Sequence, residues 1–476
     1  MLGLSLVLAA CVAVTQASSG YPVARDTSGT CSGVHARVSP PAGAIVVDNS
    51  ANPHPGSHAT VQAGVDALNT TTADPQQLFI FPGTYTEQVY IPRLTSNLTV
   101  QGYTCNTKSY QHNKVTITYN LALINTTSDD LTATLRQWNP NTKIYNLNIV
   151  NSFGHIPQNG QNLAVSAEAD GQAYYACQLI GYQDTLLAET GRQLYAKSLI
   201  VGAVDFIFGQ KALAWLESID IRTIASGSIT ASGRDSDSNP SWYVISRSNV
   251  SAINNTIPAG ISYLGRPWRD YARVVFQETY LGNNIAAAGW SQWSMSTPNT
   301  DHVTFAEYKN YGPGSVSQEG PRANFSQQLT APISIRSILG EKFQDECLKP
   351  EATCTLHILL ARSIGSVGGK SNNNATNILF SNSAIYNSQN GCRIKTNYSI
   401  TGYIANITYS NISVQNTSVY GVDVQQDCLN GGPTGCPSNG ALIENVSFRN
   451  VVGTAGANVS DYYVLCGEWS CRGFPI

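Results

Sequence analysis

Two aspartates in the stretch Gly181–Gly209, GYQDTLLAETGRQLYAKSLIVGAVDFIFG, are the first residues that suggest chemistry. Asp184 and Asp205 lie 21 residues apart, and apolar and aromatic residues are close to both in the sequence. A carboxylate in apolar surroundings costs free energy unless another group pairs with it or a reaction uses it. The separation therefore matters, because only some folds bring residues 21 positions apart into contact.

A parallel β-solenoid is one such fold. In a solenoid, the residue one full coil later lies directly above the first, about 4.8 Å away. A coil of about 20 to 22 residues would stack Asp205 on Asp184. Two carboxyl groups this close do not ionise together easily, so one pKa should rise and the other fall, as a nucleophile and a general acid require. The alternative is that both aspartates bond backbone amides in the turns between strands, a common role for aspartate in turns.

The whole chain has the composition of a globular protein that carries little charge. Of its 476 residues 42% are hydrophobic and 12% charged, and the formal net charge is −3. A nucleic-acid binder needs a basic face, so this balance disfavours that class. The sequence contains no GxSxG elbow, which disfavours an α/β serine hydrolase, and no P-loop or dinucleotide fingerprint.

The N-terminus predicts a secreted protein. The segment MLGLSLVLAACVAVTQASSG is an apolar run followed by small and polar residues, and we interpret residues 1–17 as a signal peptide cleaved after Ala17. A membrane anchor is the alternative, although the run is short for a membrane span. The 13 Asn-x-Ser/Thr sequons, among them Asn97, Asn249 and Asn406, are typical of a secreted glycoprotein.

The cysteines agree with an oxidising compartment. One of the 11 cysteines, Cys11, lies in the leader. Cys466 and Cys471 are spaced for a small disulfide loop, and Cys347 with Cys354 form a further candidate pair. No CxxC pair of the kind that binds metals occurs.

Short strands interrupted by turn residues dominate the chain. The segments AYYACQLIGYQDTL, RQLYAKSLIVGAVDFIFG and ALAWLESIDIRTI align, with Leu179, Leu199 and Ile219 recurring every 20 residues. Such repeats, without helices between them, predict an all-β, right-handed parallel β-helix. The one clear helical pattern is Ser57–Thr70, SHATVQAGVDALNT.

A second type of repeat begins after residue 341. The segments NILFSNSAIYNS, NITYSNISVQNT and NVSFRNVVGTAG start at Asn377, Asn406 and Asn445. Each alternates apolar residues and again suits one coil per repeat. We therefore predict a first β-helix domain over residues 18–340 and a second β-helix-like segment over residues 341–476.

Several motifs in the first domain resemble the signature segments of the pectin methylesterases. They are, in chain order, FIFPGTYTEQVYIP, GQNLAVSAEAD, GQAYYACQLIGYQDTL, VDFIFG, YLGRPW, AGWSQW and FAEYKNYGPG. Because independent motifs agree in order and spacing, the resemblance extends over residues 25–340. It implies a carboxylic ester hydrolase acting on methyl-esterified homogalacturonan, with no cofactor and no metal.

The resemblance implies a role for five polar residues. Asp205 would be the nucleophile that attacks the methyl ester, and Asp184 the general acid and then the general base. Gln161 and Gln183 would donate hydrogen bonds to the oxyanion, and Arg266 would orient Asp205. These residue types suit the reaction, because a carboxylate is a weak nucleophile that needs oxyanion donors and a fixed rotamer.

Aromatic residues near these positions are candidates for sugar contacts. Trp268 offers a flat face to a sugar ring, and Phe208 and Tyr174 are further substrate-binding candidates, although rings in a solenoid also fill the core. His54 and His58 could be a metal pair, but no third ligand is apparent and we expect no metal.

The C-terminal segment, residues 344–476, resembles the C-terminal part of fungal polygalacturonases. The matching motifs are SIGSVGG, NGCRIK, QQD and LCGEWSC. The resemblance implies that Arg393 and Lys395 bind a substrate carboxylate. However, the family's paired aspartates survive only as Asp345 and Glu346, and Leu360 occupies the position of a family histidine.

An inverting glycosidase needs two carboxyl groups, one on each side of the bond, so we predict that this segment is not a working hydrolase. It would instead be a non-catalytic pectin-binding module or the product of a chance gene fusion. The sequence as a whole predicts a secreted, monomeric pectinesterase that acts on plant cell walls and contacts neither nucleic acid nor membrane. A pectin depolymerase and a non-enzymatic pectin-binding solenoid are the alternatives.

Overall fold

The computed structural model describes residues 31–33, 35–316, 321–341, 362–368, 373–386, 388, 390–429, 432–455 and 460–473. The chain divides into two compact units, Met1–Cys354 and Thr355–Ile476, and we describe each by itself. The expected leader and the candidate pair Cys347 and Cys354 lie outside the described residues. Among the residues described, no helix has the length and apolar character to cross a membrane.

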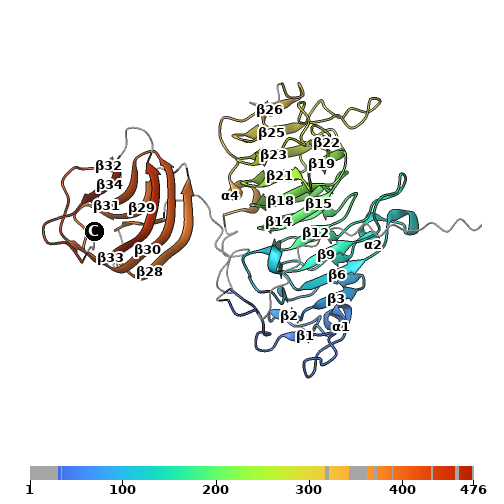
Figure 1. Ribbon diagram of the computed structural model, residues 1–476, viewed down its shortest axis with the longest axis horizontal. Coiled ribbons are helices and arrows are strands. Elements are labelled where there is room, and N and C mark those ends of the chain that lie inside the picture. Colours follow the sequence, from blue (N-terminus) through green and yellow to red (C-terminus); the bar gives the residue numbers. More distant parts are fainter. Residues whose placement is uncertain are drawn as a thin grey trace, which may run out of the picture. The chain divides into compact units, whose positions relative to one another are not determined.

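The first unit is a parallel β-helix, as predicted (Figure 1). Short strands separated by turns contribute to three parallel sheets, and strands from successive coils pair side by side. Sheet 1 contains β1 (Ile45–Val47), β2 (Gln76–Ile80), β5 (Leu98–Gly102), β8 (Thr142–Tyr145), β11 (Gln172–Tyr175), β14 (Thr190–Ala196), β17 (Lys211–Glu217), β20 (Trp242–Ser246), β23 (Arg273–Gln277), β25 (Thr304–Tyr308) and β26 (Ser326–Gln328).

The other two sheets complete each coil. Sheet 2 contains β3 (Gly83–Thr86), β6 (Val115–Tyr119), β9 (Asn148–Asn151), β12 (Gln178–Ile180), β15 (Leu199–Gly202), β18 (Asp220–Thr223), β21 (Asn249–Ala252) and β24 (Tyr280–Leu281). Sheet 3 contains β4 (Val89–Ile91), β7 (Leu135–Gln137), β10 (Val165–Ala167), β13 (Leu186–Ala188), β16 (Ile207–Gly209), β19 (Gly227–Ser232) and β22 (Ser262–Pro267). The short helices are α1 (Val61–Asp66), η1 (Tyr110–His112), η2 (Leu123–Asn125), α2 (Asp129–Thr132) and α4 (Ile335–Leu339).

Strand pairing sets the coil length near the middle of this unit at 21 residues. Leu179 pairs with Ile200, and Ile200 pairs with Ile221. The 20-residue period predicted from Leu179, Leu199 and Ile219 is therefore wrong by one residue per coil. The difference matters because a shift of one residue exchanges the two faces of a strand. Leu179 and Ile200 belong to the main core, whereas Leu199 belongs to a separate apolar cluster.

Helix α1 is shorter than the predicted helix over Ser57–Thr70. His58 exchanges backbone hydrogen bonds with β1, since its N–H donates to the Val46 carbonyl (2.9 Å) and its carbonyl accepts from the Asp48 N–H (2.9 Å). This pairing keeps the segment before the helix extended. The helix begins after Thr60, whose hydroxyl accepts from the Ala63 N–H at 3.1 Å.

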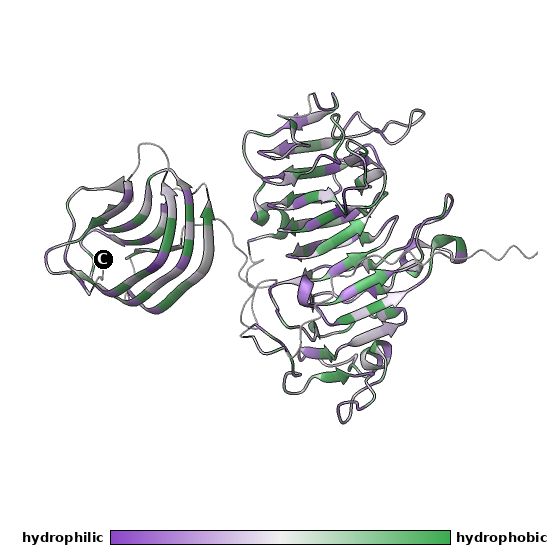
Figure 2. Ribbon diagram, in the orientation of Figure 1, coloured by the Kyte–Doolittle hydropathy of each residue, from purple (hydrophilic) through white to green (hydrophobic). Residues whose placement is uncertain are grey.

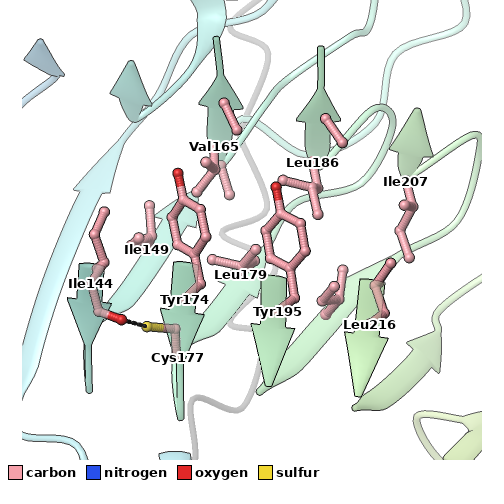
Figure 3. Packing of buried hydrophobic residues seen from close by; sticks show 14 of the residues in the cluster. Ile144, Ile149, Val165, Tyr174, Cys177, Leu179, Leu186, Tyr195, Ile207 and Leu216 are labelled. Atoms are coloured by element: carbon pink, nitrogen blue, oxygen red, sulfur yellow. Dashed lines mark hydrogen bonds between the residues drawn. The ribbon is translucent and has the colours of Figure 1, made fainter. Parts of the chain in front are cut away.

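The interior of the coils is filled by stacked side chains (Figure 3). Tyr174 stacks on Tyr195 with ring centroids 5.0 Å apart, and its hydroxyl donates to the Gln172 side chain at 3.1 Å. Tyr174 is fully buried, so the prediction that it contacts substrate is wrong. The reason is the alternation of β11, which turns Tyr174 inward while its neighbour Tyr175 stacks on Tyr145 outside the main core.

The second unit also contains stacked parallel strands. Sheet 4 contains β27 (Arg362–Val367), β29 (Asn390–Asn397), β31 (Tyr420–Leu429), the antiparallel β32 (Gly432–Pro433) and β34 (Ser460–Leu465). Sheet 5 contains β28 (Asn374–Tyr386), β30 (Gly402–Thr417), β33 (Ala441–Ala455) and β35 (Cys471–Arg472). Figure 2 shows hydrophobic and hydrophilic residues interspersed along the strands of both units. A disulfide joins Cys466 to Cys471.

An asparagine ladder sets the bend in sheet 5. Asn377, Asn406 and Asn445 occupy equivalent positions of successive coils, in the register that their sequence repeat suggests. All three adopt left-handed backbone angles, with φ of 57°, 57° and 53°. The Asn406 amide donates to Asn377 at 3.0 Å, and the Asn445 amide donates to Asn406 at 3.3 Å. Asparagine tolerates this conformation better than other residues with side chains, which explains its recurrence.

Candidate active site

Asp184 and Asp205 lie in equivalent turns of successive coils. Asp184 falls between β12 and β13, and Asp205 between β15 and β16. A parallel bridge pairs Gln183 with Val204, the residues that immediately precede the two aspartates. The 21-residue spacing thus corresponds to one turn of the β-helix.

Both aspartates have unusual backbone conformations and little contact with solvent. Their φ angles are 63° and 52°, in the left-handed region that few side chains favour. Their exposed fractions are only 7% for Asp184 and 5% for Asp205. Backbone strain of this kind often accompanies functional positions, and here it aims two carboxyl groups from adjacent coils toward one place.

Arg266, from β22, holds the Asp205 carboxylate at both oxygens. Its Nε donates to Oδ1 at 2.8 Å and its Nη2 donates to Oδ2 at 2.6 Å. This bidentate geometry fixes the carboxylate rotamer better than a single contact would. Strand register places Arg266 near Asp205. Phe208 of β16 pairs with Ala231 of β19, and Ala231 pairs with Arg266 of β22.

The two glutamines lie next to the aspartates. A parallel bridge pairs Gln161 with Gln183, and the Gln183 N–H donates to the Asn162 side chain at 3.0 Å. The side-chain oxygen of Gln161 is buried and has no hydrogen-bond partner among the described residues. An amide group in such a position can present its N–H side to a ligand.

The electrostatics differ from the simple split that sequence reasoning predicts. Burial raises the pKa of Asp184 well above its ordinary value, and the negative charges of Asp205 and Asp129 raise it further. Burial also raises the pKa of Asp205, so this pKa does not fall; Arg266 opposes the rise. The negative neighbours of Asp184 and the ion pair of Asp205 with Arg266 together favour Asp205 as the group that ionises first.

An aromatic wall borders the carboxyl groups. Phe208 and Trp268 pack together with ring centroids 6.2 Å apart, in one apolar cluster that also includes Trp293. Trp268 and Trp293 line an open hollow of about 440 Å³, with Arg269 and Asn299 beside them. Exposed indole faces next to polar groups are typical of carbohydrate sites.

Sequence reasoning missed Trp293 and Asp129. Trp293 lies in the AGWSQW motif, which shows where to look but does not distinguish its second tryptophan from the first, Trp290, which is buried in the core. Asp129 belongs to no quoted motif. Of the two histidines considered as a metal pair, His54 stacks on Phe81 and His58 forms a backbone bridge to Val47. No cluster of three potential metal ligands occurs within the described ranges.

In the second unit, the candidate cations lie beside a buried carboxylate. The Nε of Arg393 is 2.8 Å from Oδ2 of Asp423, which is 1% exposed. Burial raises the pKa of Asp423 to about 6, while Arg393 and Lys395 lower it. Arg393 is therefore already partly neutralised. Leu360 and the pair Asp345 and Glu346 lie outside the described residues.

Comparisons with known families assign the first and second parts of the chain to two different families. Residues 45–329 match the pectinesterase family, and residues 361–476 match the family 28 glycosyl hydrolases. The chain is 52% identical over 313 residues to a pectinesterase of Aspergillus niger, which covers 65% of this chain and 92% of that relative. It is 50% identical over 312 residues to a pectinesterase of Aspergillus aculeatus, covering 64% of this chain and 92% of the relative.

Solved structures agree with these matches. The deglycosylated pectin methylesterase of Aspergillus niger superposes with a TM-score of 0.60 at 34% identity, covering 65% of this chain and 98% of that one. The pectin methylesterase from carrot superposes with a TM-score of 0.58 at 24% identity, covering 66% of this chain and 98% of that one. The carrot enzyme supports the fold alone.

Proposed function

Because the chain belongs to the pectinesterase family, we propose that it removes methyl groups from methyl-esterified homogalacturonan with Asp205 as nucleophile and Asp184 as general acid and base. The products are pectate and methanol. The first unit carries the reaction, which uses side chains of this chain and one water molecule.

In the first step, an Asp205 oxygen attacks the C6 carbonyl carbon of a methylated galacturonate unit. The carbonyl oxygen gains negative charge, and the amide N–H groups of Gln161 and Gln183 stabilise it without adding a charge that would compete for Asp205. When the tetrahedral intermediate collapses, the C–O bond to the methoxy group breaks. Asp184 gives its proton to the departing oxygen, so methanol leaves and an acyl-enzyme anhydride remains.

In the second step, the ionised Asp184 takes a proton from water. The resulting hydroxide attacks the acyl carbon, the bond to Asp205 breaks, and the galacturonate acid is released. Asp184 ends the cycle protonated and Asp205 ionised. The raised pKa of Asp184, which results mainly from burial and then from Asp205, suits a group that must carry a proton at the start.

The bidentate ion pair between Arg266 and Asp205, one coil above the buried Asp184, is the observation that carries this proposal. A turn aspartate with a purely structural role would bond backbone amides, whereas the Asp205 carboxylate accepts from a guanidinium and lies next to a second carboxyl group. Trp268 and Trp293 supply flat faces on which sugar rings would stack.

Methanol release from highly methylated pectin tests the proposal, with Asp205→Asn as the key variant and Asp220→Asn as its matched control. Asp220 forms an ion pair with Arg222 on sheet 2 and has no role in the proposed chemistry. We expect Asp205→Asn to abolish release and Asp220→Asn to retain it. Persistent release from Asp205→Asn would remove the nucleophile from this position.

For the second unit we propose contact with pectin without cleavage. Within the described ranges of this unit, the buried Asp423 forms an ion pair with Arg393, and Oδ2 of the buried Asp427 accepts from the Gly435 N–H at 2.8 Å. An inverting glycosidase needs one carboxyl group as acid and another as base on either side of the bond, and at the position of the family's paired aspartates this sequence has Asp345 and Glu346. We expect no new reducing ends from polygalacturonate, and their appearance would favour the depolymerase alternative.

Secretion and glycosylation belong to the same proposal. The apolar run at residues 1–17 and the 13 sequons support export of the chain. The absence of residues 1–17 from the exported protein, and a loss of mass after treatment with an N-glycosidase, are the expected results. Retention of the run in a membrane fraction would support the anchor instead.

A further inference from the structure

Sheet 4 of the second unit carries a charged pair whose carboxylate is buried although it points away from the core. Cys392, Ile394 and Val424 belong to the core of this unit. Because side chains alternate along a strand, Arg393 of β29 and Asp423 of β31 lie on the opposite face, where strand register pairs them directly. Asp423 is nevertheless only 1% exposed. An ionised carboxyl group in that position costs free energy unless a cation stays beside it.

A single ion pair supplies that cation. The Nε of Arg393 lies 2.8 Å from Oδ2 of Asp423, whereas Oδ1 is buried and has no hydrogen-bond partner among the described residues. The other charged or titratable groups near this carboxyl group, in the described part of the unit, are Lys395 of β29, Asp427 of β31 and Tyr463 of β34. The ionised form of Asp423 therefore depends on Arg393, and Arg393 is occupied by it.

The same face of sheet 4 has the groups that an acidic sugar needs. Arg393 and Lys395 are half-buried and lie two residues apart on β29, so they point to the same side. Tyr463 pairs with Asp423 in register and stacks on Tyr420 with ring centroids 4.7 Å apart. Cations beside aromatic rings suit the carboxylate and the ring of a uronic acid. The carboxylate of such a ligand and that of Asp423 would compete for one guanidinium.

We propose that Asp423 is an internal competitor for Arg393, so that the second unit binds free galacturonate carboxylates tightly only after Asp423 has taken up a proton. A neutral Asp423 no longer holds the guanidinium, which can then pair with an anion from solution. Burial raises the pKa of Asp423 to about 6, against the opposing effect of Arg393. An exposed carboxyl group ionises near about pH 4, so a uronate is still an anion where Asp423 is already neutral.

The inference rests on the contact with pectin proposed above for this unit, and it names the ligand more closely. A methyl ester carries no charge and does not compete with Asp423. The ligand is therefore the demethylated polymer, which is the product of the reaction proposed for the first unit.

Binding of polygalacturonate to the full chain at several pH values tests the competition. The binding that Arg393→Gln lacks is the contribution of the second unit. With a pKa of about 6, the neutral fraction of Asp423 falls about tenfold between about pH 5 and about pH 7, so this contribution should weaken by about tenfold. Residues 362–476 contain no histidine, so no imidazole of this segment adds to the change.

Two variants separate the competitor from a general effect of charge. Asp423→Asn removes the competitor, and Asp461→Asn, at an exposed position of β34, changes the charge equally and is the matched control. Asp423→Asn should bind at about pH 7 as tightly as wild type does at about pH 5, because its guanidinium is free at both. Asp461→Asn should keep the wild-type dependence.

The results that would contradict the inference differ from those that would contradict the proposed contact with pectin. A second-unit contribution that stays constant over this pH range in wild type would overturn the inference, whether or not Asp423→Asn folds. An unchanged tenfold dependence in folded Asp423→Asn would also overturn it. Equal binding by wild type and Arg393→Gln at every pH would overturn both the inference and the proposed contact at this face.

Discussion

The guanidinium of Arg266 is held between Trp293 and Asp205. Its central carbon lies 4.3 Å from the centre of a Trp293 ring, while its edge donates to the Asp205 carboxylate at 2.6 and 2.8 Å. The indole takes the face of the planar group and the carboxylate takes its edge, so one rotamer satisfies both. A lysine has neither a flat face nor a two-donor edge.

Arg266→Lys should therefore lower kcat by about a hundredfold, with a smaller change in KM, because Asp205 loses its fixed rotamer. Arg222→Lys is the matched control, since Arg222 also pairs with an aspartate but on sheet 2. Steady-state methanol release measures both. Equal kcat values for the two variants would contradict the role of Arg266.

Asp184→Asn should abolish activity and yet stabilise the protein at neutral pH. Burial is the main cause that raises the pKa of Asp184 in the folded protein well above its ordinary value. Between the unfolded and the folded pKa, the folded state holds a proton that the unfolded state has released, so stability falls as pH rises through this window. Asparagine cannot ionise and avoids that loss. Thermal unfolding should show a gain over wild type at pH 7 that disappears below about pH 3.5; the same gain at both pH values would contradict this explanation.

Gln161→Leu should lower kcat by about 10²- to 10³-fold, the usual cost of losing one oxyanion donor. The expectation follows from the position of the half-buried Gln161, which a backbone bridge pairs with Gln183 next to Asp184. Gln111→Leu, at an exposed site, serves as the control. A change confined to KM would assign Gln161 to substrate binding instead of oxyanion stabilisation.

Glu87→Ala should destabilise the first unit by about 1–2 kcal/mol. The Glu87 carboxylate accepts from the N–H groups of Val61 and Gln62 at 2.8 and 2.9 Å, and so caps the N-terminus of α1 from a neighbouring turn. Urea unfolding measures the loss. The kcat of the folded variant should match wild type, since Glu87 lies outside the site; a catalytic defect without a loss of stability would show that the capping role is not the important one.

Asn406→Ala should destabilise the second unit by about 1–2 kcal/mol, because alanine tolerates a left-handed backbone poorly and cannot continue the amide ladder. Asn406 also begins a sequon, so Thr408→Val is the necessary control: it removes the sequon and keeps the asparagine. Protease susceptibility of the second unit in the full chain distinguishes the two. Equal susceptibility in both variants would indicate a glycan effect.

Part of the fold and of the candidate site follows from local sequence. The 21-residue separation of Asp184 and Asp205 equals one coil, and the repeats at Asn377, Asn406 and Asn445 align as the strands pair. The first prediction succeeds because the coils around Asp184 and Asp205 have one length, which converts sequence spacing directly into stacking. The second succeeds although the asparagines lie 29 and then 39 residues apart, because the repeated motif marks the equivalent position in each coil. The motif order likewise indicates which polar residues belong to one site.

The tertiary structure alone decided the rest. Tyr174 and Tyr175 are adjacent tyrosines, so the local sequence does not distinguish them. Only the orientation of β11 decides which of the two side chains points into the core, and it is that of Tyr174. Coil lengths also vary: Ile207 pairs with Thr230, and Thr230 pairs with Gly265, so no fixed period leads from Asp205 to Arg266. Trp293 reaches the site from the segment between β24 and β25, where its ring packs on Arg266. Turn length and strand register are set by packing across the whole β-helix, and a single sequence does not display that packing.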